Sequence, residues 1–369
     1  MRWSRGRTVE VETLADLDHR LAAGARSLDG WHLQSLDLTE RGAVLRRVDP
    51  AGALFLGCRF AGDDAELVRE RGGIVFPQVP DVPVDTYRTT LYTADELFDA
   101  GRYDECTDAR VYAWSQQPAT PDVALAMALH DHAVDEALSA WAAGRRIAGV
   151  MGGHALARGS AGYAEAARLG HLLGRTAVVA TGGGPGAMEA ANLGARLAGA
   201  PAAALGSALD RLAAVPGFHP DVGAWARVAF EVRDAHRDAH PASDPDSGQT
   251  LGVPTWHYGH EPPNVFATAI AKYFRNATRE AVLLALCNAG IVFLPGAAGT
   301  VQEVFQDACE NYYADPGSTA PMVLVGVEHW TRTLPAWPLL EALARDRVME
   351  PRIHLVDTVE EAAALLDPS

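Results

Sequence analysis

Residues 291–303 read Ile291-Val292-Phe293-Leu294-Pro295-Gly296-Ala297-Ala298-Gly299-Thr300-Val301-Gln302-Glu303, an apolar run followed by a turn of small residues and the start of a helix. Consecutive apolar residues without alternation are typical of a parallel strand that is buried on both faces. Small residues after such a strand let backbone N–H groups approach an anion at the positive end of the next helix. The stretch therefore predicts a strand, turn and helix that bind phosphate.

A second stretch of the same kind lies upstream. Residues 176–181 form an apolar run that leads into Gly182-Gly183-Gly184-Pro185-Gly186-Ala187-Met188-Glu189, and a helical pattern follows. A single glycine-rich turn of this type is as often a tight turn as a ligand site. Two copies in one domain favour a nucleotide-binding cleft.

The chain from Arg146 onward alternates strands with helices. Residues 147–151 predict a strand that ends at Gly152-Gly153-His154, a helix follows at about 162–173, and further strands are expected at 321–327 and 353–356. This order is typical of an α/β fold with a Rossmann-like, doubly wound parallel sheet. Ligands of such sheets bind beyond the carboxyl ends of the strands, where both glycine-rich turns lie.

The length of 369 residues exceeds that of a usual single domain. Residues 1–118 contain two short strand-like runs, 53–57 and 73–76, joined by a helix over 64–71, and we interpret them as a small α/β region, a candidate regulatory module. Residues 119–369 are predicted to form the nucleotide-binding catalytic domain. A helix that begins at Thr120-Pro121 leads into it.

The composition excludes several classes of function. A net charge of -16 argues against a nucleic-acid or anionic-membrane partner. Lys272 is the only lysine, so neither turn is a Walker loop, and its surroundings favour an ordinary helix residue over a Schiff base. The four cysteines form no zinc or disulfide pattern. We expect a cytoplasmic protein, because no signal sequence or membrane-length apolar run is present. We also expect no metal and no cofactor.

Residues 239–263 are rich in Pro, Asp, Gly and Ser and show no periodicity. The segment includes Trp256-His257-Tyr258-Gly259-His260-Glu261-Pro262-Pro263-Asn264. Loops of this length are uncommon unless they are functional or mobile. Two interpretations stay open, a passive surface loop and a lid whose aromatic residues stack on a base.

Together these motifs resemble the LOG (Lonely Guy) family, whose members are often mislabelled as lysine decarboxylases. The family pattern PGGxGTxxE is matched by residues 295–303, and its GGG loop by Gly182-Gly183-Gly184. Gly152-Gly153-His154, residues 181–190 and Glu261-Pro262-Pro263-Asn264 look closest to the bacterial pyrimidine/purine nucleotide 5′-monophosphate nucleosidases. The resemblance covers about residues 120–360.

The resemblance implies hydrolysis of the N-glycosidic bond of a nucleoside monophosphate, which yields a free base and ribose 5-phosphate. A competing hypothesis is a non-catalytic nucleotide-binding protein on the same fold, similar to the molybdenum-cofactor carriers. The resemblance also implies a homodimer or higher homo-oligomer. We expect the aromatic-rich segment 265–274, with the helix that continues to Cys287, to offer the apolar pairing surface.

By resemblance, Glu303 and Arg279 are the catalytic residues, and Arg275 is an alternative one turn earlier on the same helical face. Thr300-Val301-Gln302-Glu303 also fits a capping box, in which the glutamate serves only the helix start. The family loop has glycine where this chain has Ala297, which fits only if the φ angle there is negative.

Two further groups complete the predicted site. The residues expected to bind the phosphate or nucleotide are Gly183, Gly184, Gly186, Met188, Gly296, Ala297, Ala298, Gly299 and Thr300. The residues expected to contact the substrate in addition are Gly153, His154, Glu189, Glu261, Asn264 and Arg275.

Overall fold

The computed structural model describes residues 9–367 except 77, 80, 119, 237–245 and 258–260. Contacts within the chain define two compact units. Unit 1 comprises Met1–Thr90 and Trp114–Leu138, and unit 2 comprises Leu91–Ala113 and Ser139–Ser369. The sequence predicts a domain boundary between residues 118 and 119. The contacts assign residues 91–113 to unit 2 and residues 114–138 to unit 1, so neither unit ends at this boundary, and the boundary stays a prediction.

Unit 1 is built on a four-stranded parallel sheet in the order β1-β2-β3-β4. The strands place Val11, Leu33 and Phe55 side by side, and all three are fully buried in the core of the unit. The two predicted strands and their helix are confirmed as β3, β4 and α3. The elements are β1 (Val9–Val11), α1 (Leu14–Ala22), β2 (Trp31–Gln34), α2 (Gly42–Leu45), β3 (Leu54–Leu56), α3 (Asp64–Glu70) and β4 (Ile74–Phe76), with a 3-10 turn at Thr39–Arg41.

Unit 2 contains a seven-stranded sheet in the order β11-β10-β9-β5-β6-β7-β8, in which every pair of neighbours is parallel. The predicted Rossmann-like, doubly wound α/β fold is therefore confirmed. Every residue of β5, β6, β9 and β10 is buried, which explains their uninterrupted apolar sequences. The strands are β5 (Ile147–Met151), β6 (Val178–Thr181), β7 (Thr250–Gly252), β8 (Ala269–Ile270), β9 (Gly290–Phe293), β10 (Met322–Val325) and β11 (Ile353–Val356).

The chain reverses its direction across the sheet at β5. From β5 it proceeds outward through β6, β7 and β8, and then returns to place β9 on the opposite side of β5. The carboxyl ends of β5 and β9 therefore flank a topological switch point, where doubly wound sheets bind their ligands.

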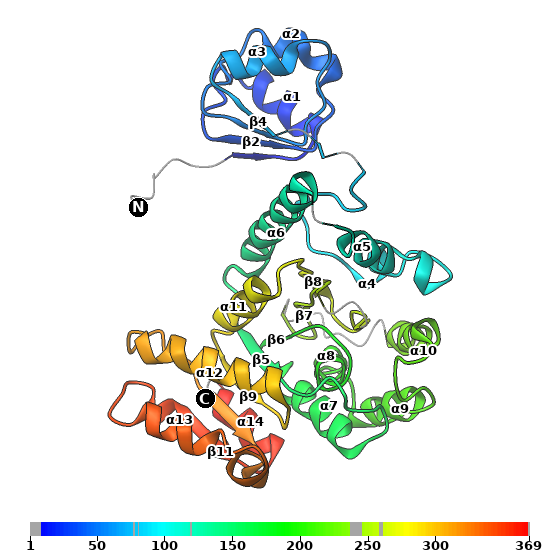
Figure 1. The fold of residues 1–369 in the computed structure, drawn as a ribbon, viewed down its shortest axis with the longest axis vertical. Helices are drawn as coiled ribbons and strands as arrows, with labels where there is room; N and C mark the ends of the chain where they lie inside the picture. The colour runs from blue at the N-terminus through cyan, green and yellow to red at the C-terminus, as the bar shows by residue number, and fades with distance from the viewer. Residues whose placement is uncertain are drawn as a thin grey trace. The chain divides into compact units, whose positions relative to one another are not determined.

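Helices cover both faces of this sheet (Figure 1). α7 packs against α8 and α14, whereas α12 packs against α11 and α13. No helix within the described ranges is long and apolar enough to cross a membrane. The remaining helices of the chain are α4 (Ala94–Leu97), α5 (Thr107–Ser115), α6 (Pro121–Ala142), α7 (Ala161–Leu173), α8 (Ala187–Arg196), α9 (Ala202–Leu212), α10 (Val222–Ala235), α11 (Asn276–Leu286), α12 (Ala298–Tyr313), α13 (Trp337–Ala344) and α14 (Val359–Leu366), with shorter turns at Tyr103–Glu105, His329–Thr333 and Glu350–Arg352.

The segment 265–274 lies inside unit 2. Val265, Phe266, Ile270 and Tyr273 are each at most 1% exposed. The expectation that residues 265–274 offer an apolar surface to a second subunit is wrong, because their side chains already pack within one chain. The part of the expectation that concerns the helix up to Cys287 stays a prediction.

Candidate functional site

A cavity of about 580 Å³ opens at the carboxyl ends of β5, β6 and β9. It joins both glycine-rich turns with the segment after β7 and the facing helices α11 and α12. The lining residues are Gly152, Gly153, His154, Ala155, Gly182, Gly184, Met188, Pro254, Thr255, Glu261, Arg279, Glu280, Ala297, Ala298, Gly299, Thr300, Gln302 and Glu303.

The N-terminus of α12 forms one wall of the cavity. Ala297 is the N-cap and its side chain cannot bond the first turn, so the N–H groups of that turn are open to water or a ligand. The φ angle of Ala297 is −114°, and alanine is therefore tolerated at the position where the resembling LOG pattern has glycine. Thr300 lies inside the helix rather than at its N-cap, so the interpretation of Glu303 as part of a capping box is wrong.

Two glycines of this turn have different roles. A Cβ atom on Gly296 would lie 2.2 Å from Oγ1 of Thr300, so the turn can pack against the threonine only with glycine at this position. A Cβ on Gly299 would meet no atom within 4 Å. Gly296 thus shapes the turn behind the cavity wall, and Gly299 leaves the wall open to a ligand.

Glu303 lies one turn into α12 and lines the cavity. Burial raises the pKa of its carboxyl to about 7, the nearby Arg279 guanidinium opposes this rise, and the Glu280 carboxylate adds to it. A carboxyl group with a pKa near neutrality can exchange a proton at physiological pH, as an acid or base in catalysis must.

Arg279 reaches the cavity from α11 and is 8% exposed. Its Nε and Nη2 donate to Oδ1 of Asn276 at 3.2 and 2.8 Å. Arg275 does not lie where the sequence predicted. It is the N-cap of α11 and has an extended backbone conformation. Its side chain is exposed and does not line the cavity. The two arginines therefore do not share a helical face directed at the site.

The opposite wall comes from the turns after β5 and β6. Gly153 and His154, predicted to contact the substrate, line the cavity, as do Gly184 and Met188, predicted to bind the nucleotide. Glu261, the third predicted substrate contact that lines the cavity, comes from the segment after β7. Nδ1 of His154 lies 3.8 Å from Oε1 of Glu261, and the histidine side chain is 57% exposed.

Gly183 and Gly186 support this wall without lining it. Both have a φ angle of +72°, a conformation that side chains rarely adopt. A Cβ on Gly186 would lie 2.5 Å from the carbonyl oxygen of His154, and one on Gly183 would lie 2.7 Å from Pro254. These glycines let the turn after β6 approach its neighbours closely.

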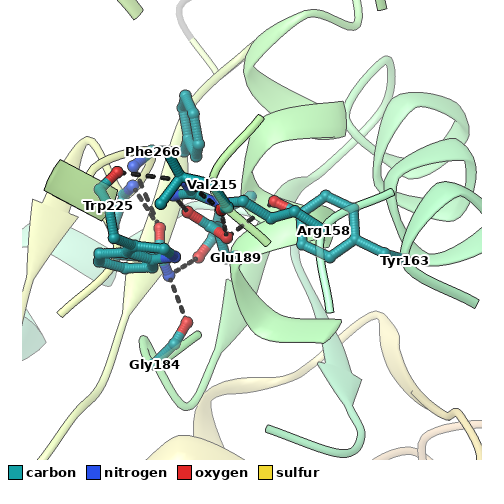
Figure 2. Close-up of polar contacts among 10 residues, drawn as sticks. Arg158, Tyr163, Gly184, Glu189, Val215, Trp225 and Phe266 are labelled. Carbon is teal, nitrogen blue, oxygen red and sulfur yellow. Dashed lines mark hydrogen bonds and ion pairs between the residues drawn. The ribbon is translucent and has the colours of Figure 1, made fainter. Parts of the chain in front are cut away.

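Glu189 is not available to a substrate. Its carboxylate is fully buried, pairs with the Arg158 guanidinium and accepts a hydrogen bond from the Tyr163 hydroxyl at 2.8 Å (Figure 2). The Arg158 guanidinium also lies over the ring of Trp225, 4.5 Å from its centre. The predicted substrate contact is replaced by a buried network that fixes the start of α8.

Asn264 is also fully buried. Its Nδ2 donates to the carbonyl oxygen of Gly184 at 3.2 Å and to Oδ1 of Asn192 at 3.0 Å, and its Oδ1 accepts from two backbone N–H groups. Asn264 therefore holds the Gly184 turn from behind, where the sequence predicted a substrate contact.

The lid interpretation fails for Trp256. The ring is 1% exposed, and its Nε1 donates to Oδ1 of Asp108 at 2.8 Å. Within the predicted loop, residues 250–252 form the strand β7, which pairs with β8 beyond the loop. Residues 239–245 and 258–260, with Tyr258 among them, lie outside the described residues.

Lys272 is not a helix residue, contrary to the expectation. It precedes α11, is 1% exposed, and its Nζ lies 2.6 Å from Oδ1 of Asp108. The same carboxylate accepts from the Tyr103 hydroxyl at 2.9 Å. Asp108 therefore gathers three donors, from Tyr103, Trp256 and Lys272, into one buried network.

Sequence reasoning missed several lining residues, among them Thr255, Glu280 and Gln302. Glu280 and Gln302 each adjoin a predicted catalytic residue along the chain. The i, i+4 spacing of Asn276 and Glu280 is the one signal that could have indicated a side-chain pair. The contact from Gln302 to Glu280 joins two helices and has no local signature.

The cavity thus combines an open helix N-terminus with one guanidinium group and one carboxyl group of raised pKa. Such a set can bind an anion, and it can stabilise charge on a reacting group beside that anion. The chain matches no protein-family model and no curated protein.

Proposed function

We propose that the protein is a nucleoside 5′-monophosphate phosphoribohydrolase, an N-glycosyl hydrolase that produces a free base and ribose 5-phosphate. The observation that supports this most is that Glu303 and Arg279, on two different helices, line one cavity with the first turn of α12. The resemblance of the two glycine-rich turns to the LOG family supports the same reaction.

The phosphate would bind at the N-terminus of α12. Ala298, Gly299 and Thr300 line the cavity there, and no side chain caps the helix. Their backbone N–H groups and the Thr300 hydroxyl are suitable donors, and the helix dipole favours the negative charge. Thr300 is three residues from Glu303, less than one turn of helix, so a phosphate bound there would bring the ribose beside that carboxyl.

Glu303 would assist cleavage of the bond between C1′ and the base. Positive charge develops on the sugar as this bond breaks, and a carboxylate beside it lowers the barrier. The same carboxylate can orient the water whose oxygen forms the new bond to C1′. The guanidinium group of arginine only donates hydrogen bonds and carries a positive charge, so Arg279 would orient the substrate or stabilise the departing base electrostatically.

The direct test is incubation of the purified protein with AMP, GMP, CMP and UMP, followed by chromatography of the products. We expect free base and ribose 5-phosphate in equal amounts from at least one nucleotide. Binding of nucleotides without release of any base would instead support the carrier hypothesis. A homo-oligomer and a cytoplasmic location stay predictions from the sequence.

A further inference from the structure

Glu280 lies between the two helices that carry the proposed catalytic residues. It is on α11 next to Arg279, lines the cavity, and is only 9% exposed. Oε1 accepts a hydrogen bond from Nδ2 of Asn276 at 2.7 Å, and Oε2 accepts one from Nε2 of Gln302 on α12. One buried carboxylate thus receives an amide donor from each helix.

The first of these contacts determines how the Asn276 amide is turned. Because Glu280 accepts from its NH₂ group, the amide oxygen must face the other way, and there it accepts two hydrogen bonds from the Arg279 guanidinium. A guanidinium has donors only, so a reversed amide would present NH₂ to it and lose both bonds. Glu280 therefore orients Arg279 through Asn276, in addition to a direct ion pair of 3.8 Å between its Oε1 and Nη2 of Arg279.

The second contact acts on the other helix. Gln302 precedes Glu303 directly, and its hydrogen bond to Glu280 ties the first turn of α12 to α11. Hydrogen bonds to an ionised acceptor are stronger than those between neutral groups. The clamp therefore keeps Glu303 and Arg279 at a fixed separation across the cavity.

Glu280 also contributes its charge. Its carboxylate raises the pKa of Glu303, against the lowering effect of Arg279. The other titratable side chains that line the cavity are His154 and Glu261, on the opposite wall, and Asp307 lies one turn further along α12.

We propose that Glu280 is a positioning residue, which orients Arg279 through Asn276 and clamps α12 to α11 through Gln302. The catalytic part of this inference rests on the proposed nucleotide hydrolysis. Its structural and electrostatic parts do not depend on that reaction.

Two substitutions of Glu280 distinguish the effect of its charge from the effect of its side-chain length. Glu280→Gln removes the charge and, because both partners are donors, loses at least one hydrogen bond. Glu280→Asp keeps the charge but shortens the side chain. Glu341→Gln, at an exposed position on α13, is the matched control. Circular dichroism verifies that each variant is folded.

The activity-independent readout is the titration of Glu303, followed by carbon-13 NMR of carboxyl-labelled glutamate and assigned by the signal that is absent in Glu303→Gln. In Glu280→Gln we expect the Glu303 titration to move to lower pH by about half a unit or more, and in Glu280→Asp and Glu341→Gln to stay near the wild-type value. An unchanged titration in Glu280→Gln would overturn the electrostatic part.

The kinetic readout is kcat/KM against pH with the best nucleotide substrate. We expect Glu280→Gln and Glu280→Asp both to lose about tenfold, since both disturb Arg279, but only Glu280→Gln to shift the pH profile. Wild-type kcat/KM in both variants would overturn the positioning role. If the wild-type protein hydrolyses no nucleotide, the proposed function fails, and the NMR titration still decides whether Glu280 acts on Glu303.

Discussion

Glu303 combines three properties that a catalytic carboxyl needs, namely access to the cavity, a neighbouring guanidinium group and a pKa raised to about 7. Because Thr300 is not the N-cap of α12, Glu303→Gln should leave the helix start unchanged. We expect this variant to lose turnover by about a hundredfold or more, on the order of 3 kcal/mol in activation free energy.

The measurement is kcat on the nucleotide from which the wild type releases base. Thermal unfolding serves as the control for folding. Wild-type kcat/KM should change with pH around 7, and this change should be absent from the residual activity of Glu303→Gln. Near wild-type turnover in the variant would remove Glu303 from the mechanism.

Asp307 lies one turn beyond Glu303, and its Oδ2 is a buried atom that lacks a hydrogen-bond partner among the described residues. Burial raises the pKa of this carboxyl from its ordinary value of 3.8 to about 8, and Glu310 adds to the rise. The folded state therefore holds this proton more tightly than the unfolded state, and the contribution of Asp307 to stability falls as pH rises from 4 to 8.

Replacement of Asp307 by Asn removes the titrating group and keeps its shape. We expect Asp307→Asn to stabilise the protein increasingly between pH 5 and pH 8, with a difference on the order of a few kcal/mol at the upper end. Chemical denaturation at several pH values measures it. A difference in stability that does not change with pH would show that Asp307 is ionised or solvated in the folded protein.

Single residues were predictable from the sequence where the motif lies on one turn. Gly299, Thr300 and Glu303 follow β9 directly, so local order fixes their place at the cavity. The roles of Lys272 and Glu189 were not predictable from the sequence. Lys272 pairs with Asp108 and Glu189 pairs with Arg158, and these partners are distant in the chain, so only tertiary packing brings the charges together.

At the scale of elements, α12 is the helix from which substrate preference should follow. Its uncapped N-terminus faces the cavity and favours a dianionic group. We expect AMP, or whichever nucleotide is cleaved best, to be hydrolysed at least about a hundredfold more efficiently than its nucleoside, because the binding energy of the phosphate is used partly in the transition state. Comparison of kcat/KM for the two checks this, and equal values would contradict it.

The contact between Lys272 and Asp108 joins the segment before α11 to α5. Removal of one member of a buried ion pair leaves the other charge uncompensated. Lys272→Met should therefore destabilise the protein by about 3 to 5 kcal/mol. The double variant Lys272→Met with Asp108→Asn should recover part of this loss, which denaturant titration would reveal as non-additivity. Additive effects would mean that the two side chains act independently.

The elements that the sequence predicted best are β5, β6, β9 and β10, whose apolar runs lack alternation. β7 and β8 were missed because they have only three and two residues, and β7 also lies in a segment rich in Pro and Gly. Their neighbourhood is held by threonine side chains, since Thr250 Oγ1 donates to the carbonyl oxygen of Phe266 at 2.7 Å and Thr268 Oγ1 donates to that of Thr250 at 2.8 Å. Such contacts across 16 to 18 residues have no local pattern.

At the scale of the whole molecule, each unit has a core of its own. The core of unit 1 is formed by residues between Val11 and Val68, which include Trp31, whereas Trp225 and Trp330 are buried in unit 2. We expect two transitions in calorimetric unfolding. Ribose 5-phosphate at about a hundred times its dissociation constant should stabilise only the transition of unit 2, by about 2.7 kcal/mol.

Tryptophan fluorescence of a Trp31→Phe variant would assign the transitions, because it removes a signal from unit 1 alone. One cooperative transition that shifts as a whole with the ligand would show that the two units unfold together.

The pairing of β5 with β9 has a consequence for the synthesis of the protein. Ala148 of β5 pairs with Gly290 of β9. The strand β9 can therefore pair with β5 only after more than a hundred further residues have been translated. The hydrophobic cluster around the sheet of unit 1, in contrast, uses only residues up to Val75. A nascent or truncated chain that ends before β9 therefore leaves β5 as an open apolar edge, which attracts other strands and invites aggregation. Chaperones and proteases recognise chains of this kind, and the cavity is complete only when α12 has left the ribosome.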